Sequence, residues 1–155
     1  MGIFFDYYRA PDRQAATADP ENSPAFDRVE TKGIDPEVCL GQLIAFIEGV
    51  SDDLSPMETV TLYPPPMTIE EWEALPDGHP HKDGPGIAEL PAGARDTLAD
   101  VADDRLAGLA AQWARIDEFF APPDEGYLVE LITDLRGLAQ RARAEDQLIY
   151  CWICM

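Results

Sequence analysis

The chain has 155 residues, 46% of them hydrophobic, and its 30 acidic residues outnumber its 11 lysines and arginines so far that the formal net charge is −19. A chain of this length can form one domain with its own core, without a disulfide or a structural metal. The hydrophobic content excludes global disorder, and the negative charge argues against a nucleic acid or an anionic membrane as the partner.

The N-terminal part of the chain is predicted to be a strand followed by an irregular segment. Residues 3–8 are aromatic and β-branched, which is typical of a β-strand. Residues 9–33 contain Pro11, Pro20 and Pro24 among many small polar residues, and this composition predicts a loop within the domain.

A buried helix is predicted between Asp35 and Gly49. Asp35 is a typical N-cap residue, Pro36 is a typical first helical residue, and Gly49 is typical of a helix end. Apolar residues recur between them at helical spacing, so we expect this helix, which contains Cys39, to be mostly buried.

The middle of the chain is predicted to hold short elements. A strand is expected over residues 59–63, and after a run of three prolines a Thr-Ile-Glu-Glu capping box opens a short helix over residues 68–75. Ile69 and Trp72 of this helix are expected to pack against the rest of the protein. Residues 76–93, with four prolines, four glycines and both histidines, are predicted to be irregular.

The C-terminal half is predicted to contain two long amphipathic helices. A short strand over residues 97–101 precedes them. Apolar residues then step by three or four positions over residues 103–120, and again over residues 124–142. Residues 148–154 are apolar on both faces, which is typical of an interior strand that is covered on each side.

These elements predict an α+β fold with a single domain over residues 1–155. We expect a small sheet that includes the N-terminal and C-terminal strands, packed by two long amphipathic helices and one buried helix. The irregular segments 9–33 and 76–93 are interpreted as loops within this domain, not as linkers between domains.

Three parts of the sequence resemble small bacterial proteins of unknown function. They are the opening Met-Gly-Ile-Phe-Phe-Asp-Tyr-Tyr, the Leu-Ala-Asp-Val-Ala-Asp-Asp-Arg-Leu of residues 98–106, and the closing Leu-Ile-Tyr-Cys-Trp-Ile-Cys of residues 148–154. The order of elements is similar to that of the YfbM-like group, which also begins and ends with strands around α-helices. The resemblance covers most of the chain and implies the fold, but it carries no catalytic motif and no site residues.

The sequence shows no feature of an exported or membrane protein. Its longest apolar run, residues 148–155, is far shorter than the roughly 20 residues that span a bilayer. Asp6 follows the apolar residues 3–5 directly, without a basic segment before them, which argues against a secretory signal. The three cysteines are therefore expected to be reduced thiols, and we expect a cytoplasmic protein without contact to a membrane.

Two of these cysteines, Cys151 and Cys154, form a C-x-x-C pattern. Redox enzymes place this pattern at the start of a helix, where the first thiol has a lowered pKa. Here it falls within a predicted strand, in which residues three apart face opposite sides, so we expect no disulfide between them and no metal site.

One alternative hypothesis is a small enzyme or a divalent-metal-binding protein. His79 and His81 are the only histidines, and with Asp77 and Asp83 they offer two imidazoles and two carboxylates to a divalent ion. The proline-rich surroundings do not fix these groups on one face, so the alternative reading is a solvated loop. The chain has no G-x-S-x-G turn and no glycine-rich phosphate loop, and we expect neither a cofactor nor enzymatic activity.

Charge is the most informative feature. No lysine or arginine lies between Lys32 and Lys82. A purely acidic interval attracts basic proteins and raises their association rates, although acidity also serves solubility alone. The acidic residues of the interval are Asp35, Glu37, Glu48, Asp52, Asp53, Glu58, Glu70, Glu71, Glu73 and Asp77.

The favoured hypothesis is therefore an acidic cytoplasmic protein-binding module with a basic protein partner, such as an immunity-type inhibitor of a basic toxin or nuclease. Aromatic side chains within a charged rim are typical of protein interfaces. The predicted partner-binding residues are Glu58, Tyr63, Glu70, Glu71, Trp72, Glu73 and Asp77.

Overall fold

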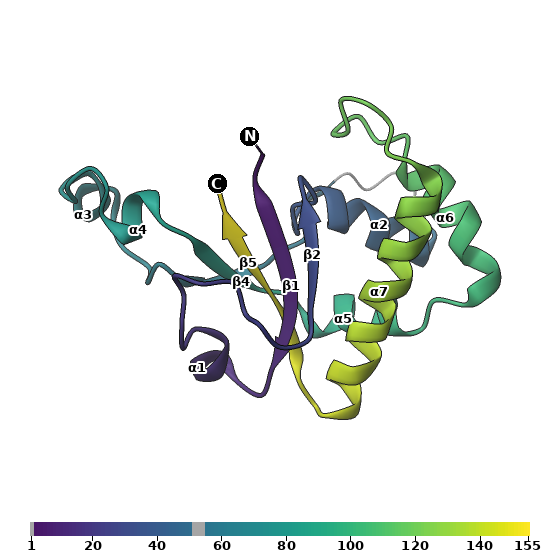
Figure 1. Cartoon of the computed structure of the whole chain (residues 1–155), viewed down its shortest axis with the longest axis horizontal. Helices are drawn as coiled ribbons and strands as arrows, with labels where there is room; N and C mark the ends of the chain where they lie inside the picture. Colours follow the sequence, from purple (N-terminus) through teal and green to yellow (C-terminus); the bar gives the residue numbers. More distant parts are fainter. Residues whose placement is uncertain (1, 51–54) are drawn as a thin grey trace.

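A computed structural model describes residues 2–50 and 55–155, and Figure 1 shows their arrangement. Asp52 and Asp53 of the acidic interval lie outside the described residues. The strands are β1 (Phe4–Ala10), β2 (Arg28–Lys32), β3 (Val60–Tyr63), β4 (Gly86–Glu89) and β5 (Leu148–Cys154). The helices are α1 (Arg13–Ala16), α2 (Cys39–Glu48), α3 (Ile69–Glu73), α4 (Pro80–Asp83), α5 (Ala92–Ala99), the 3-10 turn η1 (Asp103–Arg105), α6 (Leu106–Trp113) and α7 (Glu125–Ala144).

The strands form one antiparallel sheet of five strands in the order β2-β1-β5-β4-β3. The first and last strands pair in its centre, from Phe4 opposite Cys154 to Ala10 opposite Leu148. The predicted terminal strands, the interior position of the last one and the strand over residues 59–63 are therefore confirmed. The chain is an α+β domain, as the sequence predicts.

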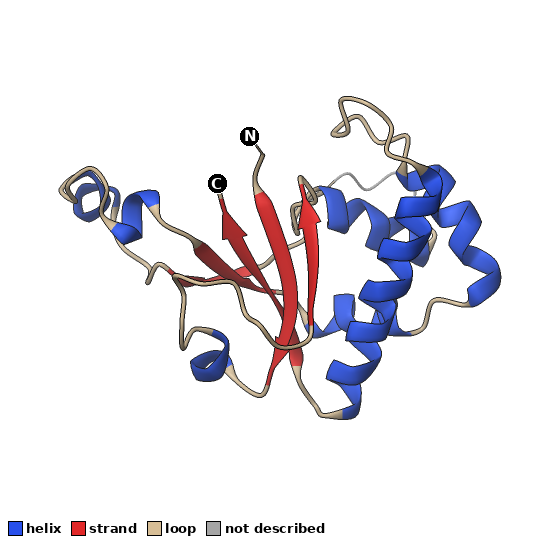
Figure 2. Ribbon diagram, in the orientation of Figure 1, coloured by secondary structure: helices blue, strands red, loops and turns tan. Residues whose placement is uncertain are grey.

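One face of the sheet is covered by α2, α5, α6 and α7, which Figure 2 shows on the same side of the strands. Their apolar residues pack against Tyr7, Ile149 and Cys151 of the sheet in a single buried cluster. α7 has Asp124 as its N-cap, and its seven buried residues recur at helical spacing. α2 ends at Gly49, whose positive φ of 75° favours glycine. The amphipathic helix predicted over residues 124–142 is confirmed. The mostly buried helix predicted between Asp35 and Gly49 is present from Cys39 to Glu48, and within it only Glu48 is exposed.

The opposite face of the sheet is covered by the segment that contains α1. Tyr8 donates a hydrogen bond of 2.6 Å from its hydroxyl to the Ala16 carbonyl, and Trp152 donates one of 3.0 Å from Nε1 to the Pro20 carbonyl. Arg13 forms two hydrogen bonds with the Glu89 carboxylate, at 2.8 and 2.9 Å. Both faces of the central strands are thus covered.

The prediction that residues 9–33 form an irregular loop is wrong, because this segment contains the end of β1, all of α1 and all of β2. β2 is an edge strand in which exposed Arg28, Glu30 and Lys32 alternate with Val29 and Thr31. Such a strand has no apolar run, and the surrounding prolines concealed its alternation.

The prediction that residues 76–93 are irregular is also wrong, because they contain α4, β4 and the first residues of α5. Pro80 occupies the first turn of α4 and His79 is its N-cap, so the proline starts a helix here. The predicted strand at 97–101 lies mostly in α5, where Ala94 and Leu98 are buried four residues apart.

The predicted helix over residues 103–120 is shorter in the structure. It consists of η1 and α6 and ends at Trp113. Beyond it, Ile116 donates a backbone hydrogen bond to the Trp113 carbonyl and Phe119 donates one to the Ile116 carbonyl. These turns continue the apolar spacing without continuing the helix.

Cys151 and Cys154 lie in a strand, as predicted. Cys39, Cys151 and Cys154 are free thiols. Cys151 belongs to the cluster beneath the helices, whereas Cys154 packs against the cluster on the opposite face. The two residues of the C-x-x-C pattern therefore point to opposite sides of the sheet.

Candidate functional site

The segment between β3 and β4, residues 64–85, projects from the sheet, and we call it the arm. It contains α3 and α4, and Figure 1 shows both at the end of the molecule opposite α6 and α7. Neither helix contains a buried residue. The rest of the chain, which we call the body, therefore holds the core, and the arm lies outside it.

α3 is formed by local interactions. The Thr68 side chain accepts a hydrogen bond from the Glu71 backbone N–H, and the Glu71 carboxylate accepts one of 2.7 Å from the Thr68 N–H. The predicted capping box is thus present, and it satisfies two N–H groups that a helix start leaves free.

The expected packing of Ile69 and Trp72 against the body is wrong. Ile69 is 73% exposed and Trp72 is 44% exposed. Because the arm leads away from the sheet, these apolar side chains have no core within reach, and they form part of the surface.

Lys82 holds the arm together. Its ammonium lies 4.9 Å from the centroid of the Trp72 ring, and it contacts the Leu75 carbonyl and an Asp77 carboxylate oxygen at 3.3 Å each. The Lys82 side chain is only 18% exposed, although that of Asp77 is fully exposed. An ammonium above a tryptophan ring stabilises this arrangement by about 0.5–1 kcal/mol at a partly exposed site.

The two histidines have structural contacts within the arm. His79 Nδ1 accepts a hydrogen bond of 3.1 Å from the His81 N–H and so caps α4. The imidazole rings are 5.0 Å apart, and the His81 ring lies 5.2 Å from that of Tyr63.

The structure does not assemble the proposed metal ligands. Asp77 pairs with Lys82, and the Asp83 carboxylate accepts a hydrogen bond from the Gly78 N–H. In the part of the chain that the structure describes, no three histidine, cysteine, aspartate or glutamate side chains lie together as a metal ion requires. The metal hypothesis therefore gains no support from the geometry.

The electrostatics of the arm are strongly negative. Glu70, Glu71, Glu73, Asp77 and Asp83 stand against one cation, Lys82, which is already paired. Within the described residues, the three glutamates have no ion pair. The arm thus presents unpaired carboxylates beside exposed apolar side chains.

The predicted partner-binding residues fall into three places. Five of them lie on the arm, and Tyr63 lies at its base beside His81. Glu58 precedes β3 and so lies at the other end of that strand from the arm. The five residues on the arm are Glu70, Glu71, Trp72, Glu73 and Asp77.

The buried thiols lack the environment of a reactive group. Burial raises the pKa of the Cys39 thiol to about 12, and the hydrogen bond and charge of Asp35 act in the same direction. Burial also raises the pKa of Cys151 well above its usual range. Both thiols therefore stay protonated near neutral pH and act as apolar core groups.

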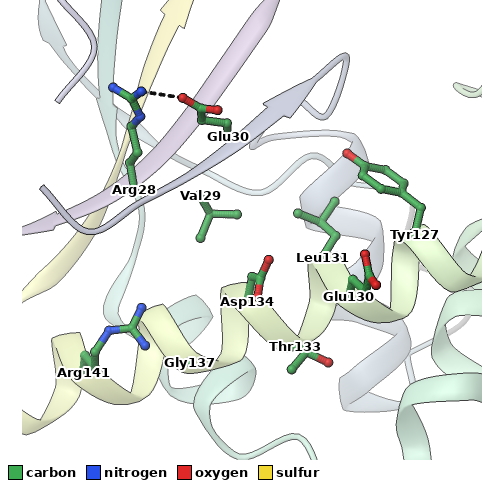
Figure 3. Close-up of a pocket in the computed structure, with 10 residues that line it drawn as sticks. All are labelled: Arg28, Val29, Glu30, Tyr127, Glu130, Leu131, Thr133, Asp134, Gly137 and Arg141. Carbon is green, nitrogen blue, oxygen red and sulfur yellow. Dashed lines mark ion pairs between the residues drawn. The ribbon is translucent and has the colours of Figure 1, made fainter. Parts of the chain in front are cut away.

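A second surface feature was missed in the sequence. A groove of about 560 Å³ runs between the edge strand β2 and the helix α7, and Figure 3 shows its lining. The groove was missed because one of its walls, β2, lies within the segment 9–33 that was predicted to be a loop. The signal that identifies its strand is the alternation of charged with β-branched residues from Arg28 to Lys32.

No helix in the described ranges, 2–50 and 55–155, is both long and apolar enough to cross a membrane. Comparison of the chain with family models, with curated proteins and with solved structures finds no match. The resemblance to the YfbM-like group therefore stays a prediction.

Proposed function

We propose that this chain is an acidic cytoplasmic protein-binding module, and that its arm contacts a basic partner protein. The observation that carries the proposal is the exposure of Ile69 and Trp72 on a projecting helix whose remaining surface is acidic. A tryptophan at the centre of a charged rim is a common energetic anchor of protein interfaces.

The composition of the arm supports a basic partner in particular. Three unpaired glutamates lie within one turn and a half of α3, on both sides of Trp72, and a net charge of −19 extends the negative field beyond the arm. Such a field accelerates encounters with positively charged proteins and repels acidic ones. A basic toxin or nuclease has the required charge, which would make the chain an immunity-type inhibitor.

The first experiment compares two variants of equal charge. Replacing Glu70, Glu71 and Glu73 by glutamine changes the net charge from −19 to −16 by removing three negative charges from the arm. The control variant Glu21→Gln, Asp117→Asn, Glu118→Gln makes the same change at exposed positions of the body. Proteins from the native cytoplasm would be captured on each form, and association rates of the captured partner measured at low and high salt.

We expect the arm variant to capture less of the partner and to associate more slowly, whereas the control keeps most of both. Raised salt should remove much of the difference, since charges are screened over about 8–10 Å. Equal behaviour of the two variants would show that net charge, not the arm, determines binding.

The second experiment tests the anchor. Trp72→Ala should weaken binding by about 2 kcal/mol if the ring is buried in the complex. Leu75→Ala, on the same arm, provides the matched control for a general loss of apolar area. An unchanged affinity of Trp72→Ala would place the interface elsewhere.

A further inference from the structure

We infer that β2 and α7 form a second binding site, which takes an extended basic peptide segment as an additional strand of the sheet. The site lies at the edge of the sheet opposite β3, and therefore opposite the arm. It is independent of the function proposed for the arm.

The first observation is that β2 has a free hydrogen-bonding edge. Among the described residues, 2–50 and 55–155, β2 pairs with β1 alone. In the same register, Gly33 lies opposite Ile3 and donates a backbone hydrogen bond of 2.9 Å to its carbonyl. Pairs that exchange hydrogen bonds recur at every second residue of an antiparallel ladder.

This alternation assigns the backbone groups of β2. Thr31 and Val29 follow Gly33 in steps of two, so their N–H and C=O groups face β1. The N–H and C=O groups of Arg28, Glu30 and Lys32 therefore point outward, where another strand can bind them.

The second observation is that a groove lies beside this edge, between β2 and α7. Its volume of about 560 Å³ lies within the range of ligand sites. Figure 3 shows Val29 pointing from β2 toward α7 and Asp134 pointing from α7 toward β2. Gly137 has no side chain and Thr133 has a short one, so neither residue fills the groove along α7.

The third observation is the charge of the groove. Both of its cations are already ion-paired, Arg28 with Glu30 at 2.5 Å and Arg141 with Asp27 at 2.7 Å. Glu130 and Asp134 have no such ion pair within the described chain. A ligand that presents lysine or arginine to α7 would complement these carboxylates.

The same charge argues against a second copy of this chain as the occupant. Two molecules with a net charge of −19 each repel one another, and pairing of their edges would bring Glu130 and Asp134 of both copies to the same groove. The occupant is therefore a basic segment of another protein, bound antiparallel to β2 as all other strand pairs of the sheet are.

Antiparallel pairing determines which peptide residues form hydrogen bonds with β2 and which have side chains that face α7. Peptide residues that bond to Arg28, Glu30 and Lys32 have their side chains on the same face as those residues, away from α7. The intervening peptide residues have side chains over Glu130 and Asp134, and their N–H groups point into solvent. The basic residues belong at these intervening positions.

The probe is an end-blocked hexapeptide in which lysine alternates with threonine. The control is the same peptide with glutamate in place of lysine. We expect the lysine peptide to bind and the glutamate peptide not to bind. On binding, amide hydrogen exchange should slow at Arg28, Glu30 and Lys32, whereas Val29 and Thr31 should change little because they are already bonded to β1.

Backbone methylation of the probe separates strand addition from charge attraction. Methylating the backbone nitrogens of the threonines removes the hydrogen bonds to β2 and should weaken binding at least about tenfold. Methylating the backbone nitrogens of the lysines, which point into solvent, should leave the affinity nearly unchanged. Equal affinities of the two methylated peptides would overturn the proposal.

Two protein variants test the site itself. Glu30→Pro removes an outward N–H and leaves the β1 ladder complete, so it should fold and lose the peptide. Glu30→Gln makes the same change of charge but keeps the N–H, so it should bind the peptide more tightly than Glu30→Pro does. The pair Glu130→Gln, Asp134→Asn should weaken binding about three- to tenfold, and the control pair Asp117→Asn, Glu118→Gln should not. Unchanged binding by both site variants, or protection of the β2 edge by self-association without peptide, would overturn the proposal.

Discussion

Trp113 and Trp72 show how differently the body and the arm use the same residue. Trp113 is fully buried beneath the helices, and its Nε1 donates a hydrogen bond of 2.9 Å to the Cys39 carbonyl. Trp72 is 44% exposed and lies beneath the Lys82 ammonium. In the body an aromatic ring joins segments far apart in the chain, whereas in the arm it contacts a residue ten positions away. The body is therefore held together by contacts between distant segments, whereas the contacts described within the arm are local.

The largest expected effect comes from removing whole segments. Deleting residues 148–155 should abolish cooperative unfolding, because β5 is the central strand and Ile149, Tyr150 and Trp152 each stabilise the fold by about 1.5–3 kcal/mol. That sum approaches the stability of a whole domain. Circular dichroism during thermal unfolding measures the outcome.

The matched deletion concerns the arm. Tyr63 lies opposite Ile87 in the β3–β4 ladder, so a short glycine-serine turn can replace residues 65–84 and close the hairpin. We expect this variant to unfold cooperatively at nearly the temperature of the full chain. A collapse of the transition would show that the arm is part of the core, and the comparison would fail.

The second prediction compares the replacement of one tryptophan in the body with the replacement of one in the arm. Trp113→Ala should lower the free energy of unfolding by about 3–5 kcal/mol, because it leaves a cavity and an unpaired Cys39 carbonyl. Trp72→Ala should lower it by no more than about 1 kcal/mol, the value of its contact with Lys82. Urea denaturation of both variants gives the ratio. Similar values would mean that the arm shares the cooperativity of the body.

The third prediction concerns Asp27, which joins β1 to α7 through Arg9 and Arg141. The Arg141 hydrogen bond, aided by Arg9, holds the pKa of the Asp27 carboxyl below its ordinary value. A carboxyl whose pKa is lower in the folded state stabilises the fold above its unfolded pKa, and this contribution disappears as the pH falls through the folded value.

Asp27→Asn should therefore cost about 1–2 kcal/mol at pH 7 and progressively less below pH 4. Denaturation at pH 7 and pH 3 measures the difference. The control Asp117→Asn removes a carboxylate that is exposed and has no ion pair within the described residues, and it should cost less than Asp27→Asn at pH 7. A cost for Asp27→Asn that does not change with pH would exclude the ion pair as its cause.

The smallest effect belongs to the arm glutamates. Replacing Glu70, Glu71 and Glu73 by glutamine should alter stability by only about a few tenths of a kcal/mol per site, because glutamine has a similar helix propensity. Glu71 should contribute most, since its carboxylate caps α3. Thermal unfolding of the triple variant checks this, and a loss of several kcal/mol would show that the charges stabilise the fold.

Several elements were predictable because local chemistry determines them. The Asp35 side chain accepts hydrogen bonds from the Val38 and Cys39 N–H groups and so caps the turn that leads into α2. α2 itself begins at Cys39, with Val38 and not Asp35 as its N-cap, and Gly49 ends it. The capping box at Thr68 and the seven buried positions of α7 are likewise readable from spacing.

The remaining elements depend on contacts that are distant in sequence. β2 is a strand because β1 pairs with it, and its charged residues gave no apolar run. The exposure of Trp72 follows from where the β3–β4 connection leaves the sheet, which no local pattern indicates. The groove lies between β2 and α7, which are distant in the sequence, so it cannot be predicted until both elements are positioned. The sequence therefore predicted the acidic residues of the arm but not the groove.

The pairing of β1 with β5 also determines when the sheet can be completed during synthesis. Phe4 lies opposite Cys154, so β1 leaves the ribosome about 150 residues before its neighbour β5. At about 5–20 residues per second, that interval lasts roughly 8–30 s. Until β5 is present, β2 and the helices can cover Tyr7 on one face of the sheet. On the opposite face, Tyr8 lacks its neighbours Tyr150 and Trp152. The sheet is therefore completed only after β5 has been synthesised, and until then the edge of β1 that pairs with β5 has no partner strand.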